Sequence, residues 1–591
     1  MGLNTRARKR ARRVATVASV LALAGPGLYA ACSAGDGPAP APPAEDAGVP
    51  RRGGRLTASL RSEPTTFNPL VAADLPSQAV LQLLMADLVH IDRATADAEP
   101  ALAESWTVSA DGRRYSVRLR PGLRFSDGTP LAVEDVVFSF RAYLDEAVAS
   151  PQRPLLLVGG EPIAVRAAGP DTVEFELAAP YAAAERLFDG FAVLPRRRLE
   201  GALAAGRLRE AWGIATDPAE VVGLGPFRLR RYQPGEHLIL ERNPHYWERG
   251  SDGQSLPYLE EIAFVIAGSE QAELIRFEAG QIDVLSGSTA EAFDSLARAD
   301  AGGRWRLVDL GPGLEQHFLF FNLNRVPGEA AVARRQAWFR NPAFRRAVSA
   351  AVDREALVRL VYRGRAAPLW VPVPPGNTRW VNREIPRPGR SLERARALLA
   401  EAGFAWDAGG ELVDGAGRRV EFSLVTNAGN RPREEMAAIL HHDLEQLGMS
   451  VQIATLEFRA LLDRLFRTFD YDACILGMVS PDADPNTEID LWSSGGGRHL
   501  WQLAPAGEPP PWQLEIDRLM SDQLTRTSFE ERRRMYDRVQ VLLAEHSPVV
   551  PLVSPHILVA ADARLGNFRP GLLPPYALWN AAELYWTAPP E

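Results

Sequence analysis

The chain contains a single lysine, Lys9, although it has 66 basic residues in all. Everything after Lys9 therefore lacks the amine that a Schiff base, a pyridoxal-phosphate anchor or a P-loop requires. Cysteine is equally scarce, with only Cys32 and Cys474. Two thiols cannot form a disulfide framework, a cysteine-rich zinc site or an iron–sulfur ligand set. These absences exclude several large enzyme classes and the small disulfide-stapled folds.

Length and composition indicate a large globular protein. The chain has 591 residues, of which 46% are apolar, 24% charged and 8% aromatic. A chain of this length is expected to hold roughly two to four compact lobes. No run reaches about 18 uninterrupted apolar residues, so we expect no transmembrane helix.

The N-terminal segment is typical of an export signal. Basic residues between Arg6 and Arg13 precede an apolar stretch at 14–24. Small residues then lead to Cys32, and this arrangement resembles a bacterial lipoprotein signal. The resemblance implies that residues 1–31 are a signal peptide and that Cys32 carries the lipid. Tyr29 stands where such signals usually have an aliphatic residue, so a plain secretory signal stays open.

Two further features of this segment bear on export and charge. Arg12-Arg13 leaves twin-arginine export as an alternative route, and residues 32–52, rich in Pro, Ala and Gly, predict a flexible linker. Residues 1–31 carry six positive and no negative charges, so their removal takes the formal net charge from −8 to −14. Such a charge argues against a nucleic-acid partner.

Hydrophobic periodicity predicts both strands and helices. Alternation at 56–60, 115–119 and 173–177 indicates half-buried strands. A period of 3.6 indicates helices at 341–360, 391–402 and 434–447, the last running into an alternating strand at 451–455. Because a helix passes directly into a strand here, we expect an α/β lobe in the C-terminal half.

No catalytic or metal motif stands out. His441 and Glu445 lie four residues apart but have no visible third ligand, so a charged helix surface explains them better. The acidic run 482–488 lacks the glycine and the final glutamate of a calcium loop. Cys474 is expected in a buried strand. We therefore predict a binding protein without enzymatic activity, metal or cofactor.

Several segments together resemble the extracytoplasmic solute-binding proteins of ABC importers, in the family that includes the oligopeptide- and dipeptide-binding lipoproteins (family 5). They occur in the family's order along the chain from about Gly53 to the C-terminus. The matching segments are 54–69, 100–106, 111–112, 119–128, 134–138, 223–227, 243–247, 277–283, 321–324 and 344–355.

The resemblance implies an α/β fold in the form of a bilobal, hinged clamp with an additional inserted domain. The first lobe would be discontinuous, and ligand would lie between lobes that close by a hinge. The predicted parts are the first lobe (53–82, 215–312 and 551–591), the inserted domain (83–214) and the second lobe (313–550).

The resemblance also implies where ligand binds. Family peptide binders neutralise the peptide's amino terminus with an aspartate in a loop that corresponds here to 477–485. In this chain Met478 replaces the family's tryptophan and Pro481 takes the aspartate's place, so Asp482 or Asp484 is expected to meet a ligand ammonium, or else to cap the loop.

Four other residues are candidates for the ligand site. Asp74 and Leu75 correspond to a family segment that lines the cleft beside the peptide backbone. Trp492 and Trp501 follow the aspartate loop and are expected either to stack on ligand or to lie in the core.

The sequence thus predicts a monomeric, membrane-anchored receptor outside the cytoplasm that binds peptides or peptide-sized solutes and delivers them to ABC importer permease subunits. The same clamp for an oligosaccharide, an opine or a metal chelate is the first alternative. An exported hydrolase and a receptor that does not transport are alternatives of other classes.

Overall fold

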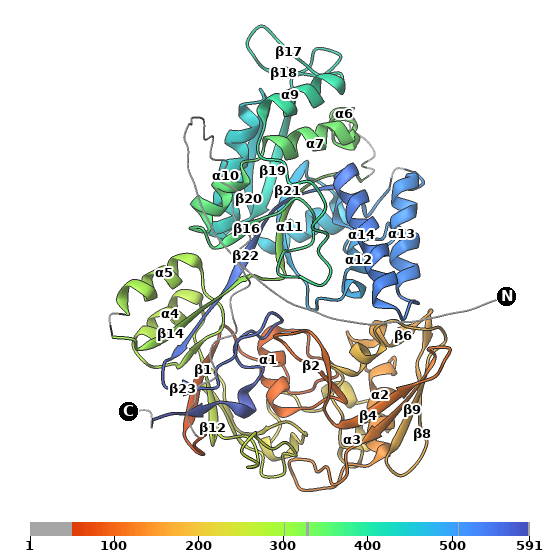
Figure 1. Ribbon diagram of the computed structural model, residues 1–591, viewed down its shortest axis with the longest axis vertical. Coiled ribbons are helices and arrows are strands. Elements are labelled where there is room, and N and C mark those ends of the chain that lie inside the picture. Colours follow the sequence, from red (N-terminus) through yellow and green to blue (C-terminus); the bar gives the residue numbers. More distant parts are fainter. Residues whose placement is uncertain (1–49, 301, 325, 327–329, 506, 589–591) are drawn as a thin grey trace, which may run out of the picture. The chain divides into compact units, whose positions relative to one another are not determined.

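Three sheets of four or more strands organise the described part of the chain (Figure 1). The computed structural model describes residues 50–588 apart from 301, 325, 327–329 and 506, and these all belong to one compact unit. Cys32 and the predicted signal therefore lie outside the described residues. No helix in the described ranges is long and apolar enough to cross a membrane.

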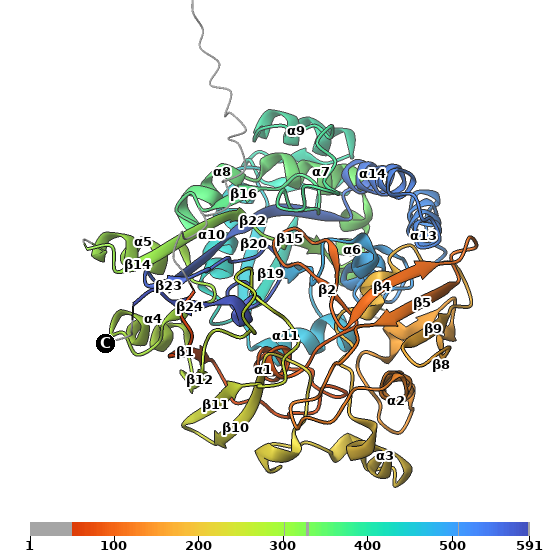
Figure 2. The ribbon, with the colours of Figure 1, turned by 60° about the horizontal axis from the view of Figure 1, so that its bottom comes forward.

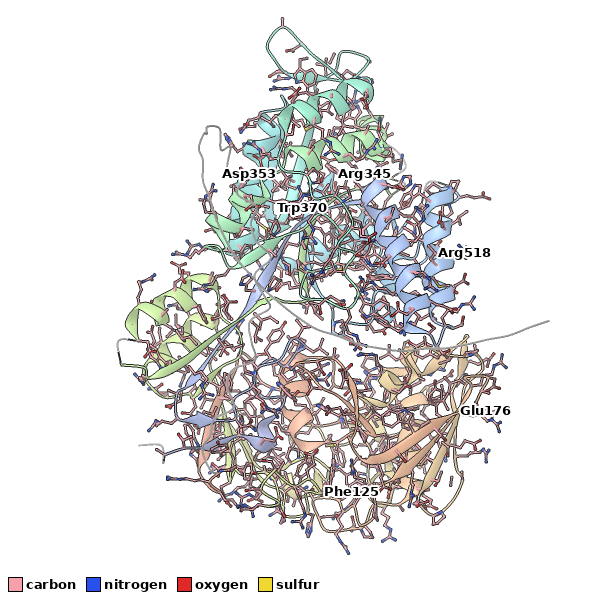
Figure 3. All side chains as sticks on the ribbon, viewed as in Figure 1. Phe125, Glu176, Arg345, Asp353, Trp370 and Arg518 are labelled. Carbon is pink, nitrogen blue, oxygen red and sulfur yellow. The ribbon has the colours of Figure 1, made fainter. Side chains whose placement is uncertain are left out.

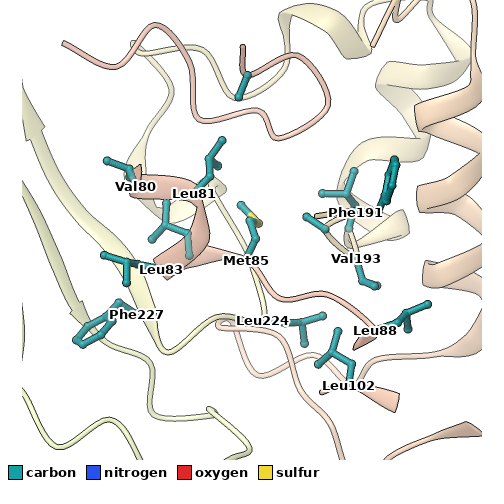
Figure 4. Packing of buried hydrophobic residues seen from close by; sticks show 14 of the residues in the cluster. Val80, Leu81, Leu83, Met85, Leu88, Leu102, Phe191, Val193, Leu224 and Phe227 are labelled. Atoms are coloured by element: carbon teal, nitrogen blue, oxygen red, sulfur yellow. The ribbon is translucent and has the colours of Figure 1, made fainter. Parts of the chain in front are cut away.

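The first sheet combines segments that are distant in sequence. Its order is β1 (Arg55–Leu60), β12 (Glu261–Ile266), β11 (His237–Arg242) and β10 (Phe227–Gln233), with β1 parallel to β12. Every second residue of β1 is buried, as the alternation predicts. Helix α1 (Leu75–Leu84) packs its apolar face beside this sheet, where Val80, Leu83 and Phe227 share one core (Figure 4).

The second sheet lies within the predicted inserted domain. Its order is β4 (Ala103–Val108), β5 (Arg114–Leu119), β9 (Thr172–Glu176) and β8 (Ala164–Ala167), antiparallel throughout. Helix α2 (Val133–Leu144) packs against it, with the rings of Phe140 and Phe175 4.9 Å apart. The Asp111-Gly112 turn joins β4 to β5, and Gly112 takes φ +68° there.

The largest sheet has the order β13 (Val284–Leu285), β22 (Val549–Asp562), β15 (Glu315–Phe321), β21 (Ala473–Val479), β19 (Glu421–Asn427) and β20 (Ser450–Leu456). β14 (Trp305–Pro312) and β16 (Ala366–Pro368) also pair with β22, and Figure 2 shows this long strand beside β14 and β15. The strands β19, β20 and β21 are parallel, and α10 (Arg431–Glu445) connects β19 to β20. This is the α/β arrangement that the helix-to-strand pattern predicts.

Two large hydrophobic cores meet along β22. Val549, Val550 and Val553 belong to the core of the second lobe, whereas Val559 and Ala561 belong to the core of the first lobe. The inserted domain shares the first-lobe core, which extends from Leu56 through the second sheet. β22 thus contributes to both cores, and among the described residues the insertion has no large core of its own. The division into lobes stays a prediction.

The structure contains helices in all three predicted regions. The prediction for residues 391–402 holds, but those for the other two regions differ from the structure. Helix α9 (Leu392–Glu401) begins after Ser391, whose side chain accepts a hydrogen bond from the amide of Arg394. Helix α10 begins at Arg431, three residues earlier than predicted, because Asn430 caps it. The prediction of one helix over 341–360 is wrong: α7 (Pro342–Ala351) ends where Asp353 caps a new helical segment, α8 (Arg354–Ala356).

The remaining elements cover the sheets or form small hairpins. The remaining helices are α3 (Arg196–Ala204), α4 (Glu270–Glu278), α5 (Ala290–Ala299), α6 (Ala330–Arg340), α11 (Phe458–Asp463), α12 (Ile489–Trp492), α13 (Pro511–Gln523) and α14 (Phe529–His546). The paired short strands are β2 (Val89–Ile91) with β3 (Ala98–Pro100), β6 (Leu157–Val158) with β7 (Glu161–Pro162), β17 (Ala405–Trp406) with β18 (Leu412–Val413), and β23 (Leu565–Gly566) with β24 (Tyr585–Trp586).

Candidate functional site

The loop that follows β21 collects the predicted ligand residues and contacts several parts of the chain. We call residues 480–485 the aspartate loop. Ala483 is buried in a small apolar cluster with Ile91 and Ala96 of the inserted domain, Leu314 and Leu573. Three segments far apart in sequence therefore meet at this loop, and they come from both predicted lobes and from the insertion.

Asp484 is buried and paired. Its carboxylate caps the short 3₁₀ turn that follows by accepting from the amide of Asn486, and it receives two hydrogen bonds from Arg532 of α14, of 2.9 and 2.6 Å. Both side chains are 6% exposed. Arg532 also lies over the Trp380 ring, 5.0 Å from its centroid. Both carboxylate oxygens of Asp484 thus bind groups of the chain itself.

Asp482 is paired with an arginine of the inserted domain. Arg186 contacts both carboxylate oxygens and also donates to the backbone carbonyl of Ala96. The two side chains are 19% and 17% exposed. Burial raises the pKa of Asp482, and the nearby Asp484 adds to this, whereas Arg186 opposes it. A ligand ammonium at this position would have to share or displace Arg186.

A second polar group lies beside the end of β21. Gly477 pairs with His317 of β15, and a Cβ at position 477 would be 2.5 Å from the His317 ring and 2.8 Å from Nη2 of Arg433. The imidazole Nε2 of His317 is 3.2 Å from Glu315 Oε1. Met478 follows as a half-buried residue that packs on the second-lobe core. The strand thus places a flexible thioether next to this group.

The two tryptophans lie in the core of the second lobe. Trp492 is 0% and Trp501 1% exposed, with ring centroids 5.7 Å apart. The indole N–H of Trp492 donates to Glu488 Oε2 at 3.0 Å. Their surroundings are those of packed core residues.

Asp74 and Leu75 lie at the start of α1, away from the aspartate loop in sequence. Asp74 caps the helix by accepting a hydrogen bond from the backbone amide of Ser77. Its other carboxylate oxygen accepts a hydrogen bond from the hydroxyl group of Thr65. Burial alone would raise the pKa of Asp74, but these hydrogen bonds lower it overall. Leu75 is 78% exposed, which is high for a leucine.

Arg186, Arg433, His317 and Glu315 are polar residues of this region that sequence reasoning does not single out. His317 and Glu315 belong to β15, near the start of the predicted second lobe, and their spacing of two places them on one face of the strand. Arg186 carries no comparable signal, because the chain uses arginine for almost all its basic residues.

Comparisons with known proteins identify the family. Residues 97–499 match the model of the bacterial extracellular solute-binding proteins, family 5 Middle. The chain belongs to this family. The predicted family, the α/β clamp fold and a substrate-binding role in ABC transport without enzymatic activity are confirmed.

Individual relatives cover most of the chain. A probable ABC transporter-binding protein of Deinococcus radiodurans is 28% identical over 74% of this chain and 76% of its own. The oligopeptide-binding protein AppA of Bacillus subtilis is 25% identical over 98% and 99%. The crystal structure of NikA from Brucella suis in complex with Fe(III)-EDTA matches with a TM-score of 0.73 and 22% identity, covering 90% and 99%. The description of the family as extracellular places its members outside the cytoplasm.

Proposed function

We propose that the protein is the lipid-anchored receptor of an ABC importer, which binds a peptide or a solute of peptide size and presents it to the permease. The observation that carries this proposal is the meeting of both lobes and the inserted domain at the aspartate loop. A ligand held there would contact all three parts at once, so its binding would favour the arrangement in which they are together.

The energetics of closing suit such a receptor. Ion pairs link the predicted parts at exposed or half-exposed positions, such as Arg431 with Glu291 at 3.1 Å and Arg379 with Asp97 at 2.6 Å. Exposed pairs of this kind contribute about 0–1 kcal/mol each. A dissociation constant near ~1 μM corresponds to roughly −8 kcal/mol. Only the part of this free energy that comes from contacts made solely in the closed arrangement biases closure, and a few kcal/mol of it would exceed the contribution of such ion pairs. The ion pairs remain easy to break on release.

The chemical nature of the cargo is the open part of this proposal. The name of AppA supports a peptide, and its alignment spans nearly the whole chain. The NikA complex supports a metal chelate as the second candidate, since an EDTA complex carries carboxylates and no ammonium group. The pairing of Asp482 and Asp484 with arginines favours a solute that needs no carboxylate partner of its own.

Export and anchoring complete the proposal. Residues 1–31 would be removed and Cys32 would carry the lipid, which leaves the linker up to residue 52 between the membrane and the folded body. The protein would act as a monomer at the outer face of the membrane, beside its permease.

Mass spectrometry of small molecules released from natively purified protein tests the proposed function. We expect a defined solute in near-stoichiometric amount that rebinds to the emptied protein. Purified protein that carries no solute, binds none of a broad peptide and metabolite panel, or turns a solute over would contradict it.

A further inference from the structure

Some of the charged side chains that the structure describes around the aspartate loop form ion pairs, and one does not. Asp482 and Asp484 each have an arginine partner, as described above. Arg433, next to Gly477, has no such partner: among the described residues, no carboxylate oxygen lies within 4.0 Å of its guanidinium. The site thus contains neutralised acids and one cation without a counter-ion in contact.

The hydrogen bonds of Arg433 are also incomplete. Nη1 donates to Oδ1 of Asn427 at 2.8 Å, but the buried Nε has no hydrogen-bond partner among the residues that the structure describes. Burial lowers the pKa of Arg433, while the nearby Glu315 raises it. A half-buried guanidinium with free donors is costly unless an acceptor arrives, and guanidinium binds carboxylates strongly through parallel hydrogen bonds.

Other buried arginines of the second lobe show what a purely structural role looks like. Arg345, labelled in Figure 3, donates to the carbonyls of Ser547, Phe339 and His546 at 2.6–2.7 Å. Arg354 likewise donates to the carbonyls of Leu369 and Ser349. Their donors are satisfied by backbone, whereas those of Arg433 are not.

The polar neighbours of Arg433 are partly buried and partly at the surface. His317 is 3% exposed, and within the described part of the chain its Nδ1 has no hydrogen-bond partner. Glu315, held by His317, is 36% exposed in its side chain, so the group reaches the surface there. The His317 ring and Nη2 of Arg433 lie so close to Gly477 that a Cβ at this position would approach them to 2.5 and 2.8 Å. These residues lie near the end of β21, the strand that leads into the aspartate loop.

We infer that Arg433 binds a carboxylate of the transported solute. This inference rests on the proposed function and deepens it: the cargo is an acid, held at this end by Arg433. Arg186 already pairs with the carboxylate of Asp482, which would otherwise bind a ligand ammonium group. The site therefore favours a solute with negative charge over one with positive charge. Glu315 opposes an incoming anion and thereby limits its affinity.

Binding of acid and amide pairs tests the assignment. The probes are N-acetyl-trialanine, its C-terminal amide, and citrate, titrated calorimetrically into protein emptied of solute. The wild type should bind at least one of the two acids, and at least tenfold more tightly than it binds the amide. Arg433→Gln, which keeps a donor for Asn427, should reduce the preference to less than twofold, and Glu315→Gln should increase acid affinity. A peptide acid and a small organic acid are distinguished by which of the two probes responds.

Arg431→Gln is the matched control, because Arg431 lies two residues away on α10, is exposed, and already pairs with Glu291 and Glu435. It should leave the preference for the acid unchanged. All variants should melt within a few degrees of the wild type. Failure of the wild type to prefer either acid, or an undiminished preference in Arg433→Gln, would overturn the inference.

The solute released from native protein separates this inference from the proposed function. A bound solute without any acidic group, or one retained equally by Arg433→Gln, would overturn the role of Arg433 and leave the receptor function standing. An acidic solute that Arg433→Gln protein no longer retains would support both.

Discussion

Arg186 and Asp482 contact each other across 296 residues of sequence and connect the predicted inserted domain to the aspartate loop. The guanidinium of Arg186 contacts both carboxylate oxygens of Asp482. Because each side chain is only about one-fifth exposed, the ion pair is screened less than a surface pair.

A double-mutant cycle should reveal this coupling. Arg186→Met and Asp482→Asn should each lower the stability of the folded body by about 1–3 kcal/mol, since each leaves a partly buried charge unpaired. The double variant should lose less than the sum of the two. Urea unfolding measures the effect, with Arg379→Met at the exposed pair with Asp97 as a control below about 1 kcal/mol. Strictly additive losses would mean that the two residues do not stabilise each other.

The Asp482→Asn variant also tests which ligand group the aspartate loop binds. If Asp482 received a ligand ammonium, Asp482→Asn would weaken a free-amine peptide more than its N-acetylated form. Its pairing with Arg186 predicts equal losses for both. A selective loss would restore the amine anchor that the family resemblance implies.

Gly477 is required by close packing and not by its backbone conformation, because its φ is not in the left-handed region. Gly477→Ala should force His317 and Arg433 apart, at a cost of about 1–3 kcal/mol, and should abolish solute binding. Gly495→Ala is the control, since a Cβ at position 495 meets nothing within 4 Å. Thermal unfolding and solute titration of both variants check this. Unchanged binding in Gly477→Ala would place the solute elsewhere.

His499 should make the protein less stable in acid. Burial lowers its pKa to about 4, and its Nδ1 lies 3.1 Å from the carbonyl of Leu491. The unfolded chain takes up this proton near pH 6.5 and the folded one only near pH 4, so stability falls as pH falls between these values, by roughly 3 kcal/mol in total.

Urea unfolding from pH 7 to pH 4 measures the slope. The His499→Asn variant should lose the part of this pH dependence of stability that comes from His499. The His442→Asn variant, at an exposed histidine, should keep the slope of the wild type. An identical slope in wild type and His499→Asn would show that other groups govern the acid response.

Lipid attachment depends on Cys32 in this account. Cys32→Ser should abolish incorporation of a fatty-acid label and release the protein from membranes, while Cys474→Ser should do neither, because Cys474 is 0% exposed within β21. Metabolic labelling followed by membrane fractionation measures both. Labelled Cys32→Ser protein would exclude this attachment site.

Local chemistry made much of the fold predictable. The alternation in β1, the helical period over 391–402 and the expected burial of Cys474 each depend on neighbours within a few residues, and the structure agrees. The break after α7 was missed because the apolar period continues through Asp353, whose side chain caps a new segment instead.

The hydrogen-bond partners of the site residues lie far away in sequence, so no local sequence pattern predicts them. The sequence indicates that the aspartate loop is special, but not that Arg186 reaches Asp482 or that Arg532 reaches Asp484, since arginine is the usual cation throughout this chain. Likewise Trp492 and Trp501 follow the loop in sequence, yet core packing buries them.

The most direct test of the account is the identity of the solute released from natively purified protein, read by mass spectrometry. The account predicts one acidic molecule of peptide size, bound unchanged in near-stoichiometric amount. Empty protein that binds nothing on re-exposure to a broad panel, or release of a chemically converted product, would contradict it.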